Sequence, residues 1–348
     1  PIYSWFYEDP FHSIFLATTT SISVLSNSLL LFIIFTTSSS NIGPYRYLLA
    51  VFAICDIMTS AGHAAFQPVF LKYVHMTSAG FYFFPRKAGI MIFGVSFDTV
   101  FCLTFIGTYY QTFLVLAYHF IYRYKNVTNG ITSSFTDSWT KRQWILVGLI
   151  VYVLYIASFV VIVAVGMTPS PETRALVPAE VMQSYGIDLT DPRTGFTVLA
   201  VRRMDRATNS MYWNAESTIS IALCLVLFVG TAGVIVYCIY QTNVAIKSAD
   251  FVLTESTRRM HSQLFRALLI QTTVPCLFSY TPLSLILITG GVTGISLGSF
   301  GNVLFLTTAI FPSVDAFFVL FFIIKFRIAV IRLFHLPFKT SRKGSSVE

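Results

Sequence analysis

Three polar residues lie in the middle of long apolar stretches, where a polar side chain is costly. They are Asn27 in VLSNSLL, Asp56 in LLAVFAICDIM and Asp315 in FPSVDAFF. Each lies about ten residues from one end of its stretch, so on helices that rise ~1.5 Å per residue the three share one depth. Such a cluster either holds water or a sodium ion, or forms a static hydrogen-bond network. We favour the network, because polar groups commonly hold packed helices together.

A basic cluster ends another apolar stretch. In HFIYRYKNV, Arg123 is flanked by Tyr122 and Tyr124 and is followed by Lys125. Such an arginine is either a snorkelling anchor within an aromatic belt or a docking point for a partner, and the sequence leaves both interpretations open. Adjacent residues of a helix do not share a face. We therefore expect the two tyrosines to grip neighbouring helices and to hold Arg123 at its depth.

An acid and two prolines mark further positions. Asp98 is expected to bind a cationic ligand, to face water, or to pair with one of the nearby bases Lys72, Arg86 and Lys87. In QTTVPCLFSYTPLSLIL, Pro275 and Pro282 each remove a backbone donor and kink a helix. They predict a hinge, although prolines are also simply tolerated in membrane helices.

The elements that carry these residues are long apolar helices. Of the 348 residues, 55% are hydrophobic and only 11% are charged, against about 25% charged in soluble proteins. The apolar runs are continuous rather than alternating with period two, and each is long enough to cross a bilayer. We therefore predict an all-α membrane protein with seven transmembrane spans, at residues 11–35, 45–71, 88–122, 144–166, 217–240, 263–289 and 299–324. The third, ~52 Å long as a helix, is expected to tilt or protrude.

The basic residues predict the orientation, because Lys and Arg collect on the cytoplasmic side. If the N-terminus lies outside, 15 of the 23 basic residues fall in inner segments. Seven spans then place the C-terminus inside. The sequon Asn126-Val127-Thr128 is then cytoplasmic and is expected to carry no glycan. A glycan there would invert the orientation.

The loops and the tail complete the organisation. Residues 1–338 are expected to form one receptor domain, and residues 339–348 a disordered cytoplasmic tail. The loop 167–216 is too long for a simple connector and is expected to fold over the outer mouth, with a strand at Phe196–Val201. Residues 326–338 read as an amphipathic helix on the inner leaflet.

All five cysteines lie inside apolar runs. They are therefore interpreted as small buried hydrophobes, and no extracellular disulfide is expected. Their spacing suggests no metal site, and we expect neither a metal nor another cofactor. The cysteines are Cys55, Cys102, Cys224, Cys238 and Cys276.

Four segments occur in an order and spacing that are specific together. They are GPYRYLLAVFAICD (43–56), HFIYRY (119–124), QLFRALLIQTTVP (263–275) followed by SYTPL, and FPSVDAFFVLFFIIKFR (311–327). Through them the chain resembles, over nearly its full length, the nematode serpentine chemoreceptors of the Str class and more distantly the G-protein-coupled receptors. The resemblance implies an olfactory-type receptor that binds a small chemical cue and activates a heterotrimeric G protein. It also implies the plasma membrane, in the cilium of a sensory neuron.

The chain departs from the wider receptor pattern at several positions. The resemblance places Arg123 at the arginine of the D-R-Y motif, but Tyr122 precedes it instead of an acid, so that ion pair is impossible. Asp315 falls where many such receptors have the N-P of N-P-x-x-Y. Ala316 follows it in place of proline, so the seventh helix is expected to kink less. The usual extracellular disulfide cysteines are absent.

A ligand and a coupling site follow from this interpretation. A small neutral or weakly polar ligand would enter from outside into a mostly aromatic pocket. The ligand-binding candidates are Cys102, Phe105, Tyr109, Thr112, Tyr280, Ser284, Asn302 and Phe305. At the inner end, basic residues would complement the C-terminus of an inserted G-protein helix. The coupling candidates are Arg123, Tyr124, Lys125, Lys247, Arg258, Arg259 and Arg266.

Other functions fit less well. The main alternative is a ligand-gated cation channel of the seven-span olfactory type, whose N-terminus would lie inside, against the charge distribution. A retinal protein needs a lysine within the last span, and none precedes Lys325. We find no internal repeat typical of a transporter and no catalytic motif of an intramembrane enzyme. No nucleic-acid partner is expected. The sequence does not identify the ligand, the G-protein subtype or the oligomeric state.

Overall fold

The structure is a computed structural model. It describes residues 10–37, 45–66, 68–75, 78–85, 89, 91–92, 95–128, 140–175, 177, 186–205, 208, 210–248, 255–285, 303 and 306–334.

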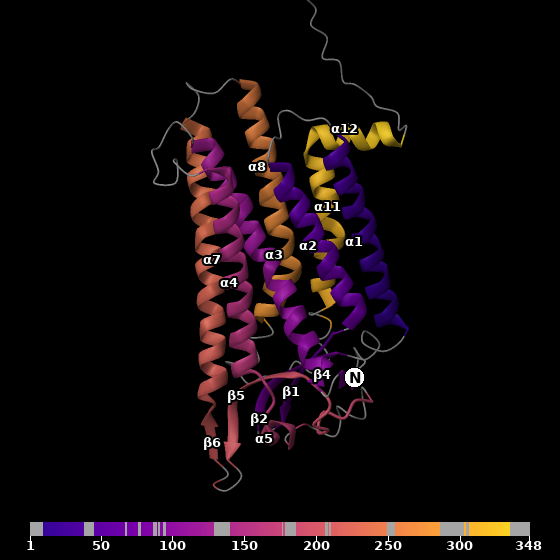
Figure 1. Cartoon of the computed structure of the whole chain (residues 1–348), viewed down its shortest axis with the longest axis vertical. Coiled ribbons are helices and arrows are strands. Elements are labelled where there is room, and N and C mark those ends of the chain that lie inside the picture. The colour runs from indigo at the N-terminus through magenta and orange to yellow at the C-terminus, as the bar shows by residue number, and fades with distance from the viewer. Residues whose placement is uncertain are drawn as a thin grey trace, which may run out of the picture.

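Long helices run side by side and form a bundle (Figure 1). They are α1 (Phe11–Thr36), α2 (Tyr45–Phe66), α3 (Phe97–Thr128), α4 (Lys141–Gly166), α7 (Ala215–Ser248), α8 (Glu255–Pro275) and α11 (Phe311–Phe322). Among the described residues, five of these helices are long and apolar enough to cross a membrane: α1, α2, α3, α4 and α7. Helix α3 contacts α2, α4, α7 and α8, so its side chains reach most of the bundle.

The predicted sixth and seventh spans are interrupted helices. Directly after Pro275, α8 continues as the π-helix η4 (Cys276–Tyr280) and then as an α-helical turn at 281–285. Proline has no N–H, so Pro282 cannot donate to the carbonyl of Phe278 four residues earlier. The hydroxyl of Thr307, in the short 3-10 helix η5 (Thr307–Ala309) before α11, donates to that carbonyl at 2.8 Å. The backbone irregularity thus joins the sixth segment to the seventh.

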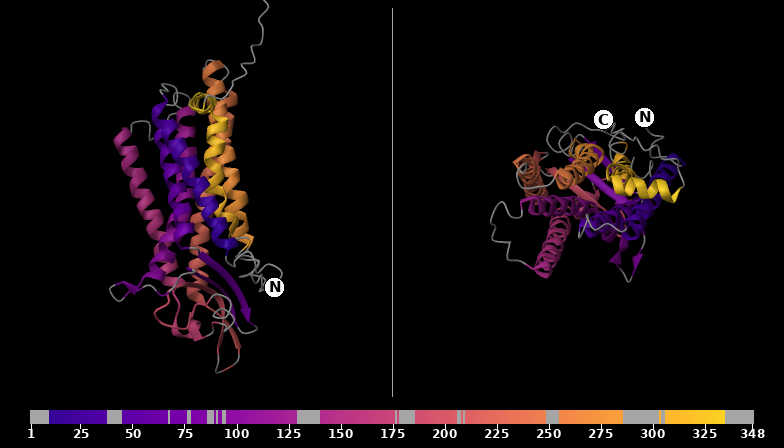
Figure 2. Two further views of the ribbon diagram at one scale, coloured as in Figure 1. Left: turned by 90° about the vertical axis from the view of Figure 1, so that its right-hand side faces the viewer. Right: turned by 90° about the horizontal axis from the view of Figure 1, so that it is seen from above.

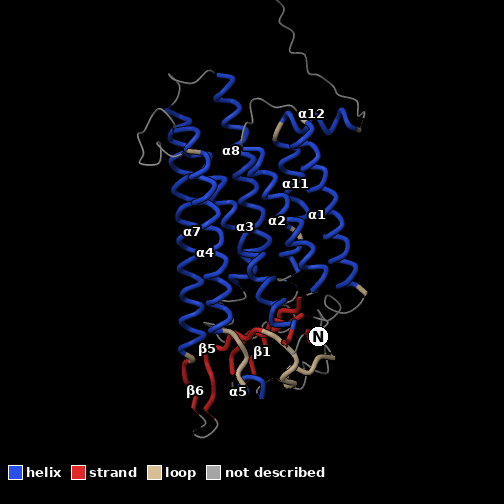
Figure 3. The backbone as a smooth tube through the Cα atoms, in the orientation of Figure 1, coloured by secondary structure: helices blue, strands red, loops and turns tan. Residues whose placement is uncertain are grey.

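An antiparallel sheet covers one end of the bundle, the end at which α1 begins (Figure 3). Its strand order is β1-β2-β5-β6, and β3 and β4 form a separate pair. The strands are β1 (Pro68–His75), β2 (Ser78–Pro85), β3 (Met91–Ile92), β4 (Val95–Ser96), β5 (Thr197–Asp205) and β6 (Ser210–Trp213). We call this end the sheet end and the opposite end the Arg123 end. Strand β5 confirms the strand predicted within the long loop.

The sheet corrects two predicted spans. Helix α2 ends at Phe66 rather than at residue 71, and α3 begins at Phe97 rather than at residue 88. The first residues of β1, Pro68–Leu71, and the residues Met91, Ile92 and Val95 of β3 and β4 are apolar, so in sequence they resemble continuations of the neighbouring spans. Tyr82 and Phe84 of β2 pack into a core within the sheet end, whereas Phe83 packs against α3.

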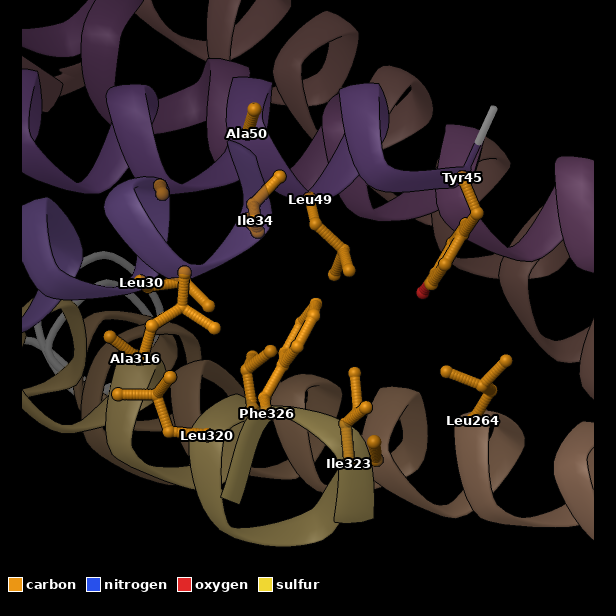
Figure 4. Close-up of a cluster of buried hydrophobic side chains, with 14 residues drawn as sticks. Leu30, Ile34, Tyr45, Leu49, Ala50, Leu264, Ala316, Leu320, Ile323 and Phe326 are labelled. Atoms are coloured by element: carbon orange, nitrogen blue, oxygen red, sulfur yellow. The ribbon is translucent and has the colours of Figure 1, made fainter. Parts of the chain in front are cut away.

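The chain turns at the Arg123 end of the bundle. Helix α11 ends at Phe322, Ile323 is extended, and α12 (Ile324–Leu333) then lies across the bundle (Figure 2). The predicted amphipathic helix at 326–338 is therefore shifted, and its residues after 334 lie outside the described part. Phe326 is buried among side chains of α1, α2, α8 and α11 (Figure 4), which fixes α12 to the bundle.

Candidate functional site

Arg123 lies in the last turns of α3 but is buried, with 3% of its surface exposed. Its guanidinium carbon lies 4.5 Å from the ring centre of Tyr45, the first residue of α2. Its Nη1 lies 3.4 Å from Nδ1 of His261 in α8, and arginine can only donate, so the imidazole accepts there. Nε and Nη2 have no hydrogen-bond partner among the described residues. Arg123 is thus enclosed by α2 and α8 without a carboxylate.

The two tyrosines beside Arg123 pack against neighbouring helices, as predicted. Tyr122 stacks on Tyr45 of α2 with ring centres 5.7 Å apart. Tyr124 contacts Tyr237 of α7 edge to face at 6.1 Å. Arg123 is therefore held at its depth from both sides.

The other coupling candidates are dispersed. Lys125 lies over the ring of Trp144 in α4, 5.6 Å from its centre. Lys247 and Arg266 are exposed on α7 and α8. Arg258 and Arg259 lie in α8, but their side chains are outside the described part. Among the coupling candidates whose side chains are described, Arg123 is the one in contact with both α2 and α8, and His261 is the contact residue that sequence reasoning missed.

The residues of the predicted polar cluster connect three helices by hydrogen bonds near mid-bundle. Asn27 of α1 donates to the carbonyls of Ser23 and Pro312, each at 3.0 Å, and so ties α1 to α11. Asp315 accepts from Nε2 of Gln271 in α8 at 3.0 Å, and Asp56 of α2 is fully buried. Gln271 was missed, although a buried glutamine within an apolar run is itself a signal.

The network is incomplete within the described residues. Both carboxylate oxygens of Asp56, Oδ1 of Asp315 and Oδ1 of Asn27 are buried without a hydrogen-bond partner there. Buried acceptors of this kind are rare and require an explanation. Asn27 and the Gln271–Asp315 pair form hydrogen bonds between helices, and both interpretations of the cluster, a static network and an ion site, stay predictions.

Aromatic residues fill the space between this layer and the sheet end. Tyr280 of η4 contacts Tyr109 edge to face at 5.9 Å and Phe113 at 4.9 Å, and Phe228 of α7 lies 5.4 Å from it. Phe105, 6.5 Å from Tyr109, continues the stack toward the sheet. Phe113 and Phe228 were missed, although Phe113 lies four residues after Tyr109 and so shares its face of α3.

The remaining ligand candidates have other neighbours. The thiol of Cys102 donates to the carbonyl of Phe83 in β2 at 3.6 Å. Thr112 is fully buried and its hydroxyl has no partner among the described residues, and Ser284 is half-buried. Asn302 and Phe305 lie outside the described residues. The structure thus brings together Phe105, Tyr109 and Tyr280 of the predicted pocket.

Asp98 accepts hydrogen bonds from the backbone at the sheet end and does not face water. It lies in the first turn of α3, fully buried, and its Oδ2 accepts the backbone N–H of Gly89 at 2.7 Å and of Gly195 at 3.3 Å. Gly195 precedes β5, so this carboxylate ties the long loop to α3. The sequence could not predict this, because both donors are main-chain groups.

Arg174 stabilises the fold of the same loop. It lies in the short helix α5 (Pro171–Ala175), with its guanidinium 4.9 Å from the ring centre of Phe196. Its Nη1 donates to the carbonyls of Leu189, Asp191 and Thr194 at 3.1, 2.9 and 2.9 Å. One side chain therefore fixes a loop that has no other regular structure at these positions.

Replacing Arg174 is expected to loosen the loop locally. Arg174→Met retains an apolar stem but leaves three carbonyls without this donor, which is expected to cost about 2 kcal/mol of local stability. Hydrogen exchange of the segment 186–205 should accelerate, while that of α3 stays unchanged. Arg174→Lys keeps the charge without the fork geometry and should give an intermediate rate. Equal rates in all three proteins would contradict this role.

Comparison with known proteins gives consistent matches. The model of the family described as serpentine type 7TM GPCR chemoreceptor Str matches residues 12–331. The G-protein coupled receptor str-33 of Caenorhabditis elegans is 22% identical over 328 residues, covering 94% of this chain and 90% of that protein. Serpentine receptor class r-10 of the same organism is 21% identical, covering 84% and 81%. Squid rhodopsin matches in fold with a TM-score of 0.62 at 11% identity, covering 95% of this chain and 86% of rhodopsin.

Proposed function

We propose that this chain, which belongs to the Str family of serpentine seven-transmembrane chemoreceptors, is an olfactory-type receptor that activates a heterotrimeric G protein. The family is one of multi-pass membrane receptors rather than enzymes. In this proposal the sheet end faces outward, and the Arg123 end with α12 faces the cytoplasm. The plasma membrane of a sensory cilium is the proposed location.

The observation that carries the proposal is the position of Arg123. It lies in the last turns of α3, the helix that contacts most of the bundle, and between α2 and α8. Movement of the Arg123 end of α8 would expose a guanidinium to the cytoplasm. The C-terminus of an inserted G-protein helix carries a partial negative charge that such a group complements.

Helix α8 has the features of a moving element. The π-helix η4 lies between Pro275 and Pro282, and π-helical turns are frequent at functional sites. Tyr280 belongs to this turn and lies in the aromatic cluster with Tyr109. A ligand that displaces Tyr280 would therefore act on the same turn about which α8 is proposed to swing.

The ligand is proposed to bind at the aromatic cluster beneath the sheet. Aromatic side chains with few polar groups suit a small neutral or weakly polar compound. Phe105→Ala and Tyr280→Ala are each expected to raise the half-maximal agonist concentration by about tenfold, which corresponds to ~1.4 kcal/mol. The measurement is a dose response with an identified agonist. Unchanged responses in both variants would show that the pocket lies elsewhere.

The test of the whole proposal is reconstitution. The purified receptor in lipid nanodiscs is expected to accelerate nucleotide exchange on a heterotrimeric G protein when an agonist is added. No acceleration with any G protein, combined with ligand-evoked current in cells that lack G-protein function, would instead indicate a ligand-gated channel.

A further inference from the structure

Three residues of α3 converge on Tyr45. The hydroxyl of Tyr45 lies 3.1 Å from Nδ1 of His119, within hydrogen-bonding distance. The ring of Tyr122 stacks on one side at 5.7 Å, and the guanidinium of Arg123 lies over the Tyr45 ring at 4.5 Å. Tyr45 itself is buried, with 3% of its surface exposed. Its ring is therefore held in one orientation by three contacts from a single neighbouring helix.

The contact with Arg123 carries unusual weight because the guanidinium is buried. A charged group removed from water must have a compensating partner. No carboxylate lies within salt-bridge distance of Arg123 among the residues the structure describes, and Tyr122 occupies the preceding position. Among the described residues, the electron-rich face of Tyr45 and the imidazole of His261 contact this guanidinium. Cation–π contacts are strongest when they are desolvated in this way.

Tyr45 is also packed against the helix that is proposed to move. Leu264 of α8 and Tyr45 belong to one buried cluster, which also holds Ile323 and Phe326 (Figure 4). His261 lies three residues before Leu264, so both occupy the same face of α8. Displacement of this end of α8 would remove His261 from Arg123 and Leu264 from Tyr45 together.

We infer that Tyr45 is a latch: its ring holds the Arg123 guanidinium in a buried, uncoupled position while α8 is packed against both residues. The latch rests on the proposed function, because it regulates the same coupling site. An acidic residue just before the arginine would hold the guanidinium through an ion pair. In this chain the aromatic face of Tyr45 on α2 holds it instead of a carboxylate on α3. Agonist binding would release Arg123 by moving α8 away.

The latch is tested by nucleotide exchange measured without agonist and normalised to surface receptor. Tyr45→Leu removes the aromatic face and is expected to raise this basal exchange roughly thirtyfold, the size of one desolvated cation–π contact. Tyr45→Phe keeps the face and loses only the hydroxyl, so its basal exchange should stay within about twofold of the unmodified receptor. Agonist-stimulated exchange should persist in both variants.

Tyr47 provides a matched control on the same turn of α2. The guanidinium of Arg46 lies 4.9 Å from the centre of its ring, but Tyr47 is 53% exposed. Tyr47→Leu removes a cation–π contact of similar geometry at an exposed position, and its basal exchange should not change. A rise in this variant equal to that of Tyr45→Leu would overturn the latch.

Other outcomes also decide the question. Basal exchange of Tyr45→Leu equal to that of the unmodified receptor, with a normal agonist response, would refute the latch and leave the proposed function intact. If Tyr45→Leu fails to reach the surface, His261→Ala tests the α8 side of the latch, because His261 is only half-buried. Its basal exchange should rise several-fold, and an unchanged value would refute the latch. Failure of agonist to stimulate any protein, the unmodified receptor included, would refute the proposed function itself.

Discussion

Arg123→Ala is expected to reach the cell surface and bind agonist normally, yet to lose agonist-stimulated nucleotide exchange by at least about thirtyfold. Removing one partner of a desolvated charged contact costs roughly 2–5 kcal/mol, and each 1.4 kcal/mol is a factor of ten. In the proposed active state Arg123 is the group that α8 uncovers for the G protein. Exchange measured per surface receptor is the appropriate quantity.

The burial of Arg123 argues against a membrane anchor. A snorkelling arginine keeps its guanidinium in water, whereas Arg123 is 3% exposed and enclosed by α2 and α8. The anchor interpretation predicts poor trafficking with normal exchange per surface receptor. A normal rate for Arg123→Ala would therefore remove Arg123 from the coupling mechanism.

Arg142→Ala is the matched control for charge. Arg142 is exposed in the first turn of α4, at the same end of the bundle as Arg123. Its removal lowers the positive charge of that end equally but should leave nucleotide exchange unchanged.

Arg123→Ala also separates coupling from the latch, because it removes the coupling group together with the group that the latch holds. Its exchange should be low with and without agonist, whereas that of Tyr45→Leu should be high without agonist.

The helices were predictable because lipid imposes a simple rule on them. A helix in contact with lipid is continuously apolar, and α1, α4 and α7 lie within a few residues of their predicted bounds at most ends. Strand β1 begins inside the predicted second span, and β3 and β4 lie inside the predicted third span, because their residues Pro68–Leu71, Met91, Ile92 and Val95 are as apolar as the adjoining helices. Apolar content alone therefore could not distinguish these short apolar strands from the end or the start of a span.

The residues of the site could be predicted from their types, but the groups that they contact could not. Asp56, Asp315 and Arg123 stand out because polar groups are rare in apolar runs. Tyr45 does not stand out in a chain with 18 tyrosines, and its role depends on α2 packing against α3. Asp98 is bound by main-chain N–H groups, which every non-proline residue has. Such pairings are visible only once the helices and the sheet are placed.

Gly195→Ala is expected to detach the sheet end from α3. A Cβ at this position would overlap the backbone nitrogen and the side chain of Thr99, and would lie 2.6 Å from Oγ of Ser96. Backbone atoms in the first turn of α3 cannot rotate away, so the segment before β5 must shift. The shift would also break the bond from Gly195 N–H to Asp98. Overpacking costs about 1–3 kcal/mol, and a buried acceptor that loses one donor adds about 1–3 kcal/mol.

Hydrogen exchange of residues 196–205 is the direct measurement of this detachment. Gly195→Ala should accelerate it by more than about thirtyfold, since ~2 kcal/mol of local stability is lost. Asp98→Ala should give a smaller increase, because it removes the acceptor without an overlap. Gly148→Ala is the control, since no atom lies within 4 Å of its added Cβ and α4 should gain slightly in helix propensity. If residues 196–205 exchange hydrogen at the same rate in Gly195→Ala and Gly148→Ala, the contact between the long loop and α3 does not hold the sheet in place.

Because β5 packs Leu199 and Val201 against Phe105, a detached sheet should also weaken agonist binding while leaving the Arg123 end unaltered.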